Sequence, residues 1–124
     1  MVGKRVLIVD DEDDIREVAR VSLELIGGFT VLTARSGNEG VTVARSERPD
    51  VILLDVMMPD LDGVATFQAL QADEATGTIP VIFLTAKLQV SDRRRFSGLG
   101  AKSIIAKPFD PLALPVQVKG ALGW

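Results

Sequence analysis

The chain of 124 residues contains no cysteine and no histidine, and these two absences exclude several kinds of chemistry. Without cysteine there are no disulfides, no reactive thiolates and no zinc sites built on cysteine. Without histidine there is no Ser-His-Asp or Cys-His catalysis, no histidine-ligated metal and no role as a histidine phosphocarrier. Any metal or transfer chemistry must therefore rest on carboxylates, hydroxyls and amines.

The chain also has fewer basic than acidic residues and contains no long apolar run. The chain has 14 Lys and Arg residues against 17 Asp and Glu residues, a net charge of −3, which argues against nucleic acid as a direct partner. Only four apolar residues lie between Lys4-Arg5 and Asp10, too few for a signal-peptide core. No apolar run approaches the ~20 residues of a membrane span. We therefore expect a cytoplasmic protein without membrane insertion.

Strand-like and helix-like segments alternate along the chain, which predicts βαβ units and an α/β fold with a parallel sheet. No linker or repeat divides the sequence, so one domain over residues 1–124 is expected. The expected strands cover residues 5–9, 29–34, 50–54, 80–84 and 102–106. The expected helices cover residues 13–26, 36–47, the region around 64–70, 91–98, and a last helix that begins at 111.

Helix-end signals support these boundaries. Ser36 and Glu39 have the spacing of a capping box at the start of the second helix. Asp110 can cap the last helix with Pro111 at its first position. Pro115 lies one turn further on and removes a backbone donor, so we expect a kinked or shifted start there.

Polar side chains stand where four apolar runs end. Asp10 and Asp11 follow the first run, Asp55 the third, Thr85 the fourth and Lys107 the fifth. The carboxyl ends of parallel strands meet at the same edge of a sheet, where ligands bind. Three carboxylates repel one another unless a cation neutralises them, and Mg²⁺ prefers such oxygen ligands. The pattern indicates a site for a divalent cation and a phosphoryl group.

Each of these residues also has an ordinary structural interpretation. The acidic run from Asp11 to Asp14 is typical of solvated loop residues or helix caps. A lone Asp55 at a strand end can be a turn residue, or a nucleophile that forms an aspartyl phosphate. Thr85 and Lys107, taken singly, are an ordinary strand-end residue and an ordinary surface lysine.

Four stretches taken together resemble a known family. VLIVDDEDDIR begins at Val6, ILLDVMMPDLDG at Ile52, VIFLTA at Val81 and IIAKPFDPL at Ile104. In this order and spacing the chain resembles a two-component response-regulator receiver domain, of the stand-alone, chemotaxis-regulator-like kind. The resemblance implies a doubly wound, flavodoxin-like, five-stranded parallel sheet in the order 2-1-3-4-5.

The resemblance also implies roles for individual residues. Asp10 and Asp11 match the acidic pair that holds Mg²⁺, with Asp11 the more direct ligand, and Asp55 matches the phosphoacceptor. The remaining matches are the metal-binding backbone carbonyl at Met57, the switch hydroxyl of Thr85, the small residue Ala86, the phosphoryl-binding Lys107 and, after it, Pro108, often a cis peptide.

The implied partners are a sensor histidine kinase or histidine phosphotransferase as donor and an unidentified output protein. The domain would catalyse only its own phosphorylation and dephosphorylation, and would signal through the surface of the fourth helix, fifth strand and fifth helix. The chain is either a stand-alone regulator or a piece of a longer one. Ile104 departs from the family, which often has an aromatic switch residue there.

Other functions remain open. Haloacid-dehalogenase-type phosphatases need a second Asp where this chain has Met57, and flavodoxins need a phosphate-binding loop where it has acidic residues. A pseudo-receiver would keep the fold without phosphorylation. Arg93-Arg94-Arg95 is either a solvated helix face or a docking contact for an acidic partner, and Trp124 is expected to pack against the core at the end of the last helix.

Overall fold

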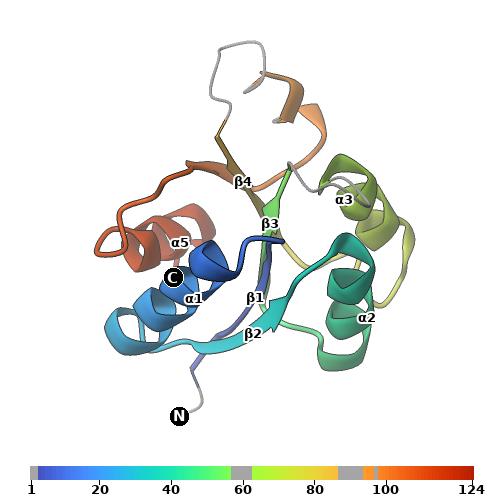
Figure 1. Cartoon of the computed structure of the whole chain (residues 1–124). Coiled ribbons are helices and arrows are strands. Elements are labelled where there is room, and N and C mark those ends of the chain that lie inside the picture. Colours follow the sequence, from blue (N-terminus) through green and yellow to red (C-terminus); the bar gives the residue numbers. More distant parts are fainter. Residues whose placement is uncertain (1–2, 57–62, 87–93, 97) are drawn as a thin grey trace.

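The computed structural model describes residues 3–56, 63–86, 94–96 and 98–124. Its centre is a sheet of five parallel strands in the order β2-β1-β3-β4-β5 (Figure 1), which confirms the predicted doubly wound, flavodoxin-like fold. The strands are β1 (Arg5–Val9), β2 (Thr30–Ala34), β3 (Val51–Asp55), β4 (Val81–Thr85) and β5 (Ser103–Ala106).

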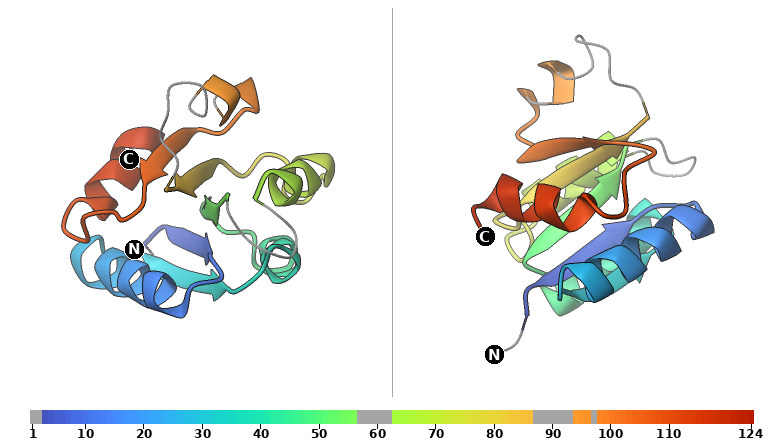
Figure 2. Two further views of the ribbon diagram at one scale, coloured as in Figure 1. Left: turned by 45° about the horizontal axis from the view of Figure 1, so that its top comes forward. Right: turned by 90° about the vertical axis from the view of Figure 1, so that its left-hand side faces the viewer.

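Helices cover both faces of this sheet, as Figures 1 and 2 show. They are α1 (Asp13–Val21), the π-helical η1 (Ser22–Ile26), α2 (Gly37–Glu47), α3 (Gly63–Ala72) and α5 (Leu114–Leu122). Residues 94–96 and 98 are also helical, in the region where a helix over 91–98 was expected; residues 91–93 and 97 lie outside the described residues. No helix in the described ranges is long and apolar enough to cross a membrane.

Two apolar clusters hold the helices against the two faces of the sheet. Ala19, Leu23 and Leu114 pack from α1, η1 and α5 onto one face of the sheet, and Phe67 and Leu70 pack from α3 onto the other. All five residues of β3 are buried, which explains its uninterrupted apolar sequence: a central parallel strand is covered on both faces. This core holds the carboxyl ends of the central strands in fixed positions.

Several predicted boundaries need correction. The expected helix over 13–26 is α-helical only to Val21, and Gly27 then bonds to Ser22, five residues back. The spacing of apolar residues does not separate these two helix types. The strand expected from residue 29 begins at Thr30, and the third and fourth strands lie one residue later than predicted. Asp55 and Thr85 are thus the last residues of their strands.

The start of the last helix is also different from the prediction. Pro111 is not its first residue, because Asp110 forms a turn in which its side chain accepts from Leu112 N at 2.9 Å. The helix begins at Leu114, so Pro115 falls in the first turn, where no backbone donor is required. The predicted shift is confirmed, and so is the Ser36 cap, which accepts from Glu39 N at 3.1 Å.

Candidate functional site

Strand ends bring the predicted polar residues to one edge of the sheet. Asp10 directly follows β1, Asp55 and Thr85 end β3 and β4, and Lys107 directly follows β5. The backbone pairing between β4 and β5 extends to this edge, because Lys107 N donates to Thr85 O at 2.9 Å. Four segments far apart in sequence therefore meet at the site, as the apolar runs predicted.

The three predicted acidic residues form one group. Oxygens from Asp10, Asp11 and Asp55 all lie within 4.8 Å of one another. Asp10 and Asp55 are buried, at 0% and 2% exposure, whereas Asp11 is exposed. Buried carboxylates this close require a neutralising cation, and a hard divalent ion suits an all-oxygen set of this kind.

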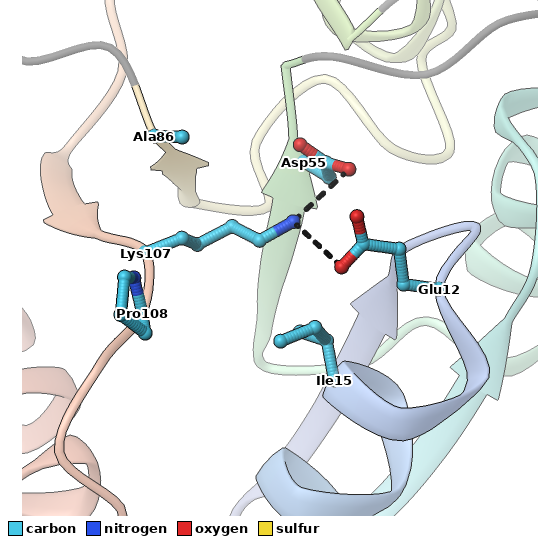
Figure 3. Close-up of a pocket in the computed structure, with 6 residues that line it drawn as sticks. All are labelled: Glu12, Ile15, Asp55, Ala86, Lys107 and Pro108. Atoms are coloured by element: carbon cyan, nitrogen blue, oxygen red, sulfur yellow. Dashed lines mark ion pairs between the residues drawn. The ribbon is translucent and has the colours of Figure 1, made fainter.

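Lys107 supplies positive charge to this group. Its Nζ lies 2.9 Å from Asp10 Oδ2, 3.3 Å from Asp55 Oδ2 and 4.0 Å from Glu12 Oε2. Figure 3 shows the side chain reaching across the pocket to Asp55 and Glu12. Burial alone would lower the pKa of Lys107, but the hydrogen bond to Asp10 and the charges of Asp10, Asp55 and Glu12 outweigh it and raise that pKa. Lys107 is therefore a cation at neutral pH.

Asp10 is held by several protein groups. Its Oδ1 accepts from Glu12 N at 2.9 Å and its Oδ2 accepts from Lys107. Its backbone oxygen accepts from Arg16 Nη1 at 2.9 Å. The side chain of Asp11, by contrast, is exposed at the mouth of the acidic group. The two residues of the acidic pair thus have different environments, one fixed inside and one at the solvent boundary.

A cavity of about 270 Å³ opens beside these groups. Figure 3 shows its lining: Glu12, Ile15, Asp55, Ala86, Lys107 and Pro108. Ala86 is exposed and small, so it leaves access to Asp55, while Thr85 is fully buried next to it in sequence. The peptide between Lys107 and Pro108 is cis, which the resemblance implied. Met57, the predicted carbonyl ligand, lies outside the described residues.

Three contributors were not identified from the sequence. Glu12 was counted with the solvated acidic run, although its place directly after the acidic pair could have indicated the pocket. Ile15 was assigned to the apolar side of the first helix, and its position in the first turn, next to the site, was the available signal. Nothing in the spacing of Arg16 indicated its bond to the backbone of Asp10.

Three further predictions concern residues outside the pocket: the switch position, the arginine run and the C-terminal tryptophan. Ile104 is half-buried and packs against the apolar cluster on the α3 side of the sheet, paired with Phe83 of β4. Arg94 and Arg95 are exposed, and Arg93 lies outside the described residues. Trp124 is 38% exposed, and its ring lies against the core residue Phe29 with centroids 6.0 Å apart, which agrees with the position expected at the end of α5.

The chain is similar to proteins of one known family. The family model described as the response regulator receiver domain matches residues 6–119. The phosphate regulon transcriptional regulatory protein PhoB of Pseudomonas aeruginosa is 41% identical over 122 residues, covering 98% of this chain and 53% of that protein. The probable transcriptional regulator ycf27 of Guillardia theta is 41% identical over 119 residues, covering 96% of this chain and 45% of that protein.

Solved structures show the same likeness. The chemotaxis response regulator CheY4 of Vibrio cholerae superposes with a TM-score of 0.89 at 29% identity, covering 97% of this chain and 99% of that one. A receiver domain of a histidine kinase from Syntrophus aciditrophicus gives a TM-score of 0.84 at 35% identity, covering 98% and 91%. The chain spans about half the length of the curated relatives named above. It belongs to the response-regulator receiver domains of two-component signalling.

Proposed function

We propose that this domain is a phosphorylation-controlled switch in which Asp55 accepts a phosphoryl group from a phosphohistidine. The donor would be a sensor histidine kinase or a histidine phosphotransferase. The observation that supports this best is the buried Asp55 carboxylate, 3.3 Å from Lys107 Nζ and within 4.8 Å of the other two acidic side chains. A carboxylate nucleophile needs such a charged, positioned setting.

The transfer itself is a displacement at phosphorus. One Oδ of Asp55 forms the new P–O bond while the P–N bond to the donor imidazole breaks. The imidazole nitrogen keeps the electron pair and takes a proton from solvent. Lys107, already beside Asp55, pairs with the phosphoryl oxygens, and Thr85 at the end of β4 donates a hydrogen bond to one of them.

Receiver domains bind Mg²⁺ at an acidic pocket, and the residues here fit that ion. Asp11 and Asp55 would hold it directly, Asp10 would support it, and the Met57 carbonyl would complete the protein ligands. When bound, the ion neutralises the carboxylates and the charge that develops on the transferring group. The role of Asp10 is supported by the two hydrogen bonds that fix its carboxylate in place.

The output would be a change of surface. Movement of Thr85 and Lys107 toward the phosphoryl group would shift the helix expected over residues 91–98, β5 and α5, a two-state change biased by local electrostatics. The 124 residues would act as one receiver unit and turn over no external substrate. The curated relatives are transcriptional regulators about twice as long, so an output protein or domain that acts in transcription is one class to test.

The test is the intact mass of the protein after incubation with acetyl phosphate, with and without Mg²⁺. We expect a Mg²⁺-dependent gain of one phosphoryl group in the parent and none in Asp55→Asn, which removes the nucleophilic oxygen and keeps the shape. Asp50→Asn is a matched control, because Asp50 lies at the opposite end of β3, where it accepts from Arg5 N. No gain from acetyl phosphate or from a phosphorylated kinase would contradict the proposal and favour a pseudo-receiver.

A further inference from the structure

Glu12 belongs to the pocket as well as to the acidic loop. Its side chain lines the cavity that contains Asp55, and its Oε2 lies 4.0 Å from Lys107 Nζ. Figure 3 shows its carboxylate directed into the space in front of Lys107 and Asp55. The backbone N of Glu12 donates to Asp10 Oδ1 at 2.9 Å, and this bond fixes the backbone of Glu12 relative to Asp10. A third carboxylate therefore faces Lys107 beside Asp10 and Asp55.

The three carboxylates are not neutralised equally. Lys107 lies 2.9 Å from Asp10 and 3.3 Å from Asp55, and both partners are buried. Glu12 is further from the same ammonium and its side chain is 60% exposed. A divalent ion in the acidic group would offset charge among the aspartates. The charge of Glu12 would remain at the solvent side of the cavity, where a phosphodonor has to enter.

We propose that Glu12 is a specificity-determining residue, which disfavours small anionic phosphodonors by placing negative charge at the entrance to Asp55. This inference rests on the proposed function, because it concerns the same transfer. A free phosphate compound brings its full charge past Glu12, and like charges a few ångströms apart repel even when partly solvated. The repulsion lowers the encounter rate without touching the reacting atoms, so it acts on donor entry.

A comparison of two donors of different charge separates charge repulsion by Glu12 from a general change in the phosphorylation rate. With acetyl phosphate, Asp55 Oδ bonds to phosphorus, the bond from phosphorus to the acetyl oxygen breaks, and acetate leaves with the electron pair. With phosphoramidate, the P–N bond breaks and the nitrogen leaves as ammonia after taking a proton. Acetyl phosphate is the more negative donor at neutral pH, and it should be disfavoured more strongly by Glu12.

The variant is Glu12→Gln, which removes the charge and keeps the size. Phosphorylation rates are measured by intact mass at low donor concentration with Mg²⁺. We expect a rise of about 3- to 10-fold with acetyl phosphate at low salt, a smaller rise with phosphoramidate, and a smaller difference at high salt because exposed charges are screened. Glu12→Asp keeps the charge and should stay near the parent rate with both donors.

The matched control is Asp14→Asn. Asp14 is an exposed carboxylate in the first turn of α1 and is absent from the cavity lining. The phosphorylation rate of the Asp14→Asn variant should therefore stay within about twofold of the parent rate. Asp13 is less suitable, because it pairs with Arg16, which in turn holds the backbone of Asp10.

An unchanged or slower Glu12→Gln rate, or an equal rise in Asp14→Asn, would overturn the inference. In either case a mass gain in the parent would leave the proposed function standing. If parent and Glu12→Gln both gain no mass from either donor, the inference is also overturned, because removing the charge has not opened the site. The proposed function then depends on the kinase trial described above.

Discussion

Lys107 Nζ donates to Asp10 Oδ2 at 2.9 Å, a shorter distance than the 3.3 Å that separates it from the proposed phosphoacceptor. The lysine is 10% exposed and Asp10 is fully buried. Lys107 thus neutralises the acidic group in the protein as it stands, in addition to the role proposed for it after phosphorylation. Removing it would leave Asp10 and Asp55 close together with no ammonium between them.

Lys107→Met should lower the free energy of unfolding at pH 7 by about 3 kcal/mol, because breaking a buried ion pair leaves uncompensated charge. Mg²⁺ should restore part of this loss, since the ion would replace the missing positive charge. Urea unfolding with and without Mg²⁺ measures both effects. Lys102→Met, at an exposed position just before β5, is the control and should change stability by less than about 0.5 kcal/mol. Equal stability of the two variants would contradict the structural role of Lys107.

The raised pKa of Lys107 gives a second prediction. A raised pKa in the folded state means that the ammonium is stabilised by folding, so its contribution is complete below the ordinary lysine value of 10.5. The contribution should be lost as pH rises through the higher folded value. The difference in unfolding free energy between parent and Lys107→Met should therefore be constant from pH 7 to pH 9 and should shrink above about pH 10.5. Urea unfolding of both proteins at several pH values measures it, and a difference that shrinks already between pH 7 and pH 9 would be inconsistent with the raised pKa.

Most of the fold and the chemistry-bearing part of the site could be predicted from the sequence. Buried parallel strands have uninterrupted apolar runs, and the residues that end such runs share an edge, so Asp10, Asp55, Thr85 and Lys107 were found together. Distances could not be predicted, because the 4.0 Å approach of Glu12 to Lys107 depends on where the loop after β1 turns.

The ends of helices were the least predictable part. The apolar spacing in 13–26 fits α and π turns alike, and the π segment ends in a wide backbone bond from Gly27 N to Ser22 O. The start of α5 depends on the turn that Asp110 forms, which competes with the cap predicted from Pro111. In both cases a local hydrogen bond decided between structures that the sequence pattern allows equally.

Gly63 gives a third prediction, because it is the point where α3 approaches the end of β3, the strand that carries the proposed phosphoacceptor Asp55. A Cβ on Gly63 would lie 2.3 Å from Asp55 O and 2.3 Å from Val56 Cα, both of them backbone atoms. Gly63→Ala should therefore destabilise the fold by about 1–3 kcal/mol and slow phosphorylation, since relief of the clash must shift Asp55 or the start of α3. Urea unfolding and the acetyl phosphate assay measure the two effects.

Gly120→Ala is the matched control for that substitution. Gly120 lies within α5 and is exposed, and a Cβ on it would point into open space. Alanine is favoured over glycine in a helix, so this change should stabilise the fold by about 0.5–1 kcal/mol and leave phosphorylation unchanged. Two Gly→Ala changes in one protein should thus act in opposite directions, and a stabilising Gly63→Ala would show that the close approach is not rigid.

Trp124 provides the last prediction, since it lies far from the site. Its ring packs on Phe29 and lies 5.1 Å from Lys4 Nζ, and Lys4 precedes β1 while Asp10 follows it. A strand of five residues separates the two ends by about 17 Å. Addition of Mg²⁺ or acetyl phosphate should therefore leave Trp124 emission unchanged, whereas urea should shift it as the contact with Phe29 is lost.

The positive control for this measurement is Ala86→Trp in a Trp124→Phe background. Ala86 is exposed and lines the cavity beside Asp55, so an indole there should respond to Mg²⁺. A saturable response in this variant together with a silent Trp124 would confirm that the ion acts locally at the carboxyl ends of the strands. A saturable response of Trp124 itself would show instead that the change reaches the amino-terminal end of β1, where the indole packs on Phe29 and lies beside Lys4.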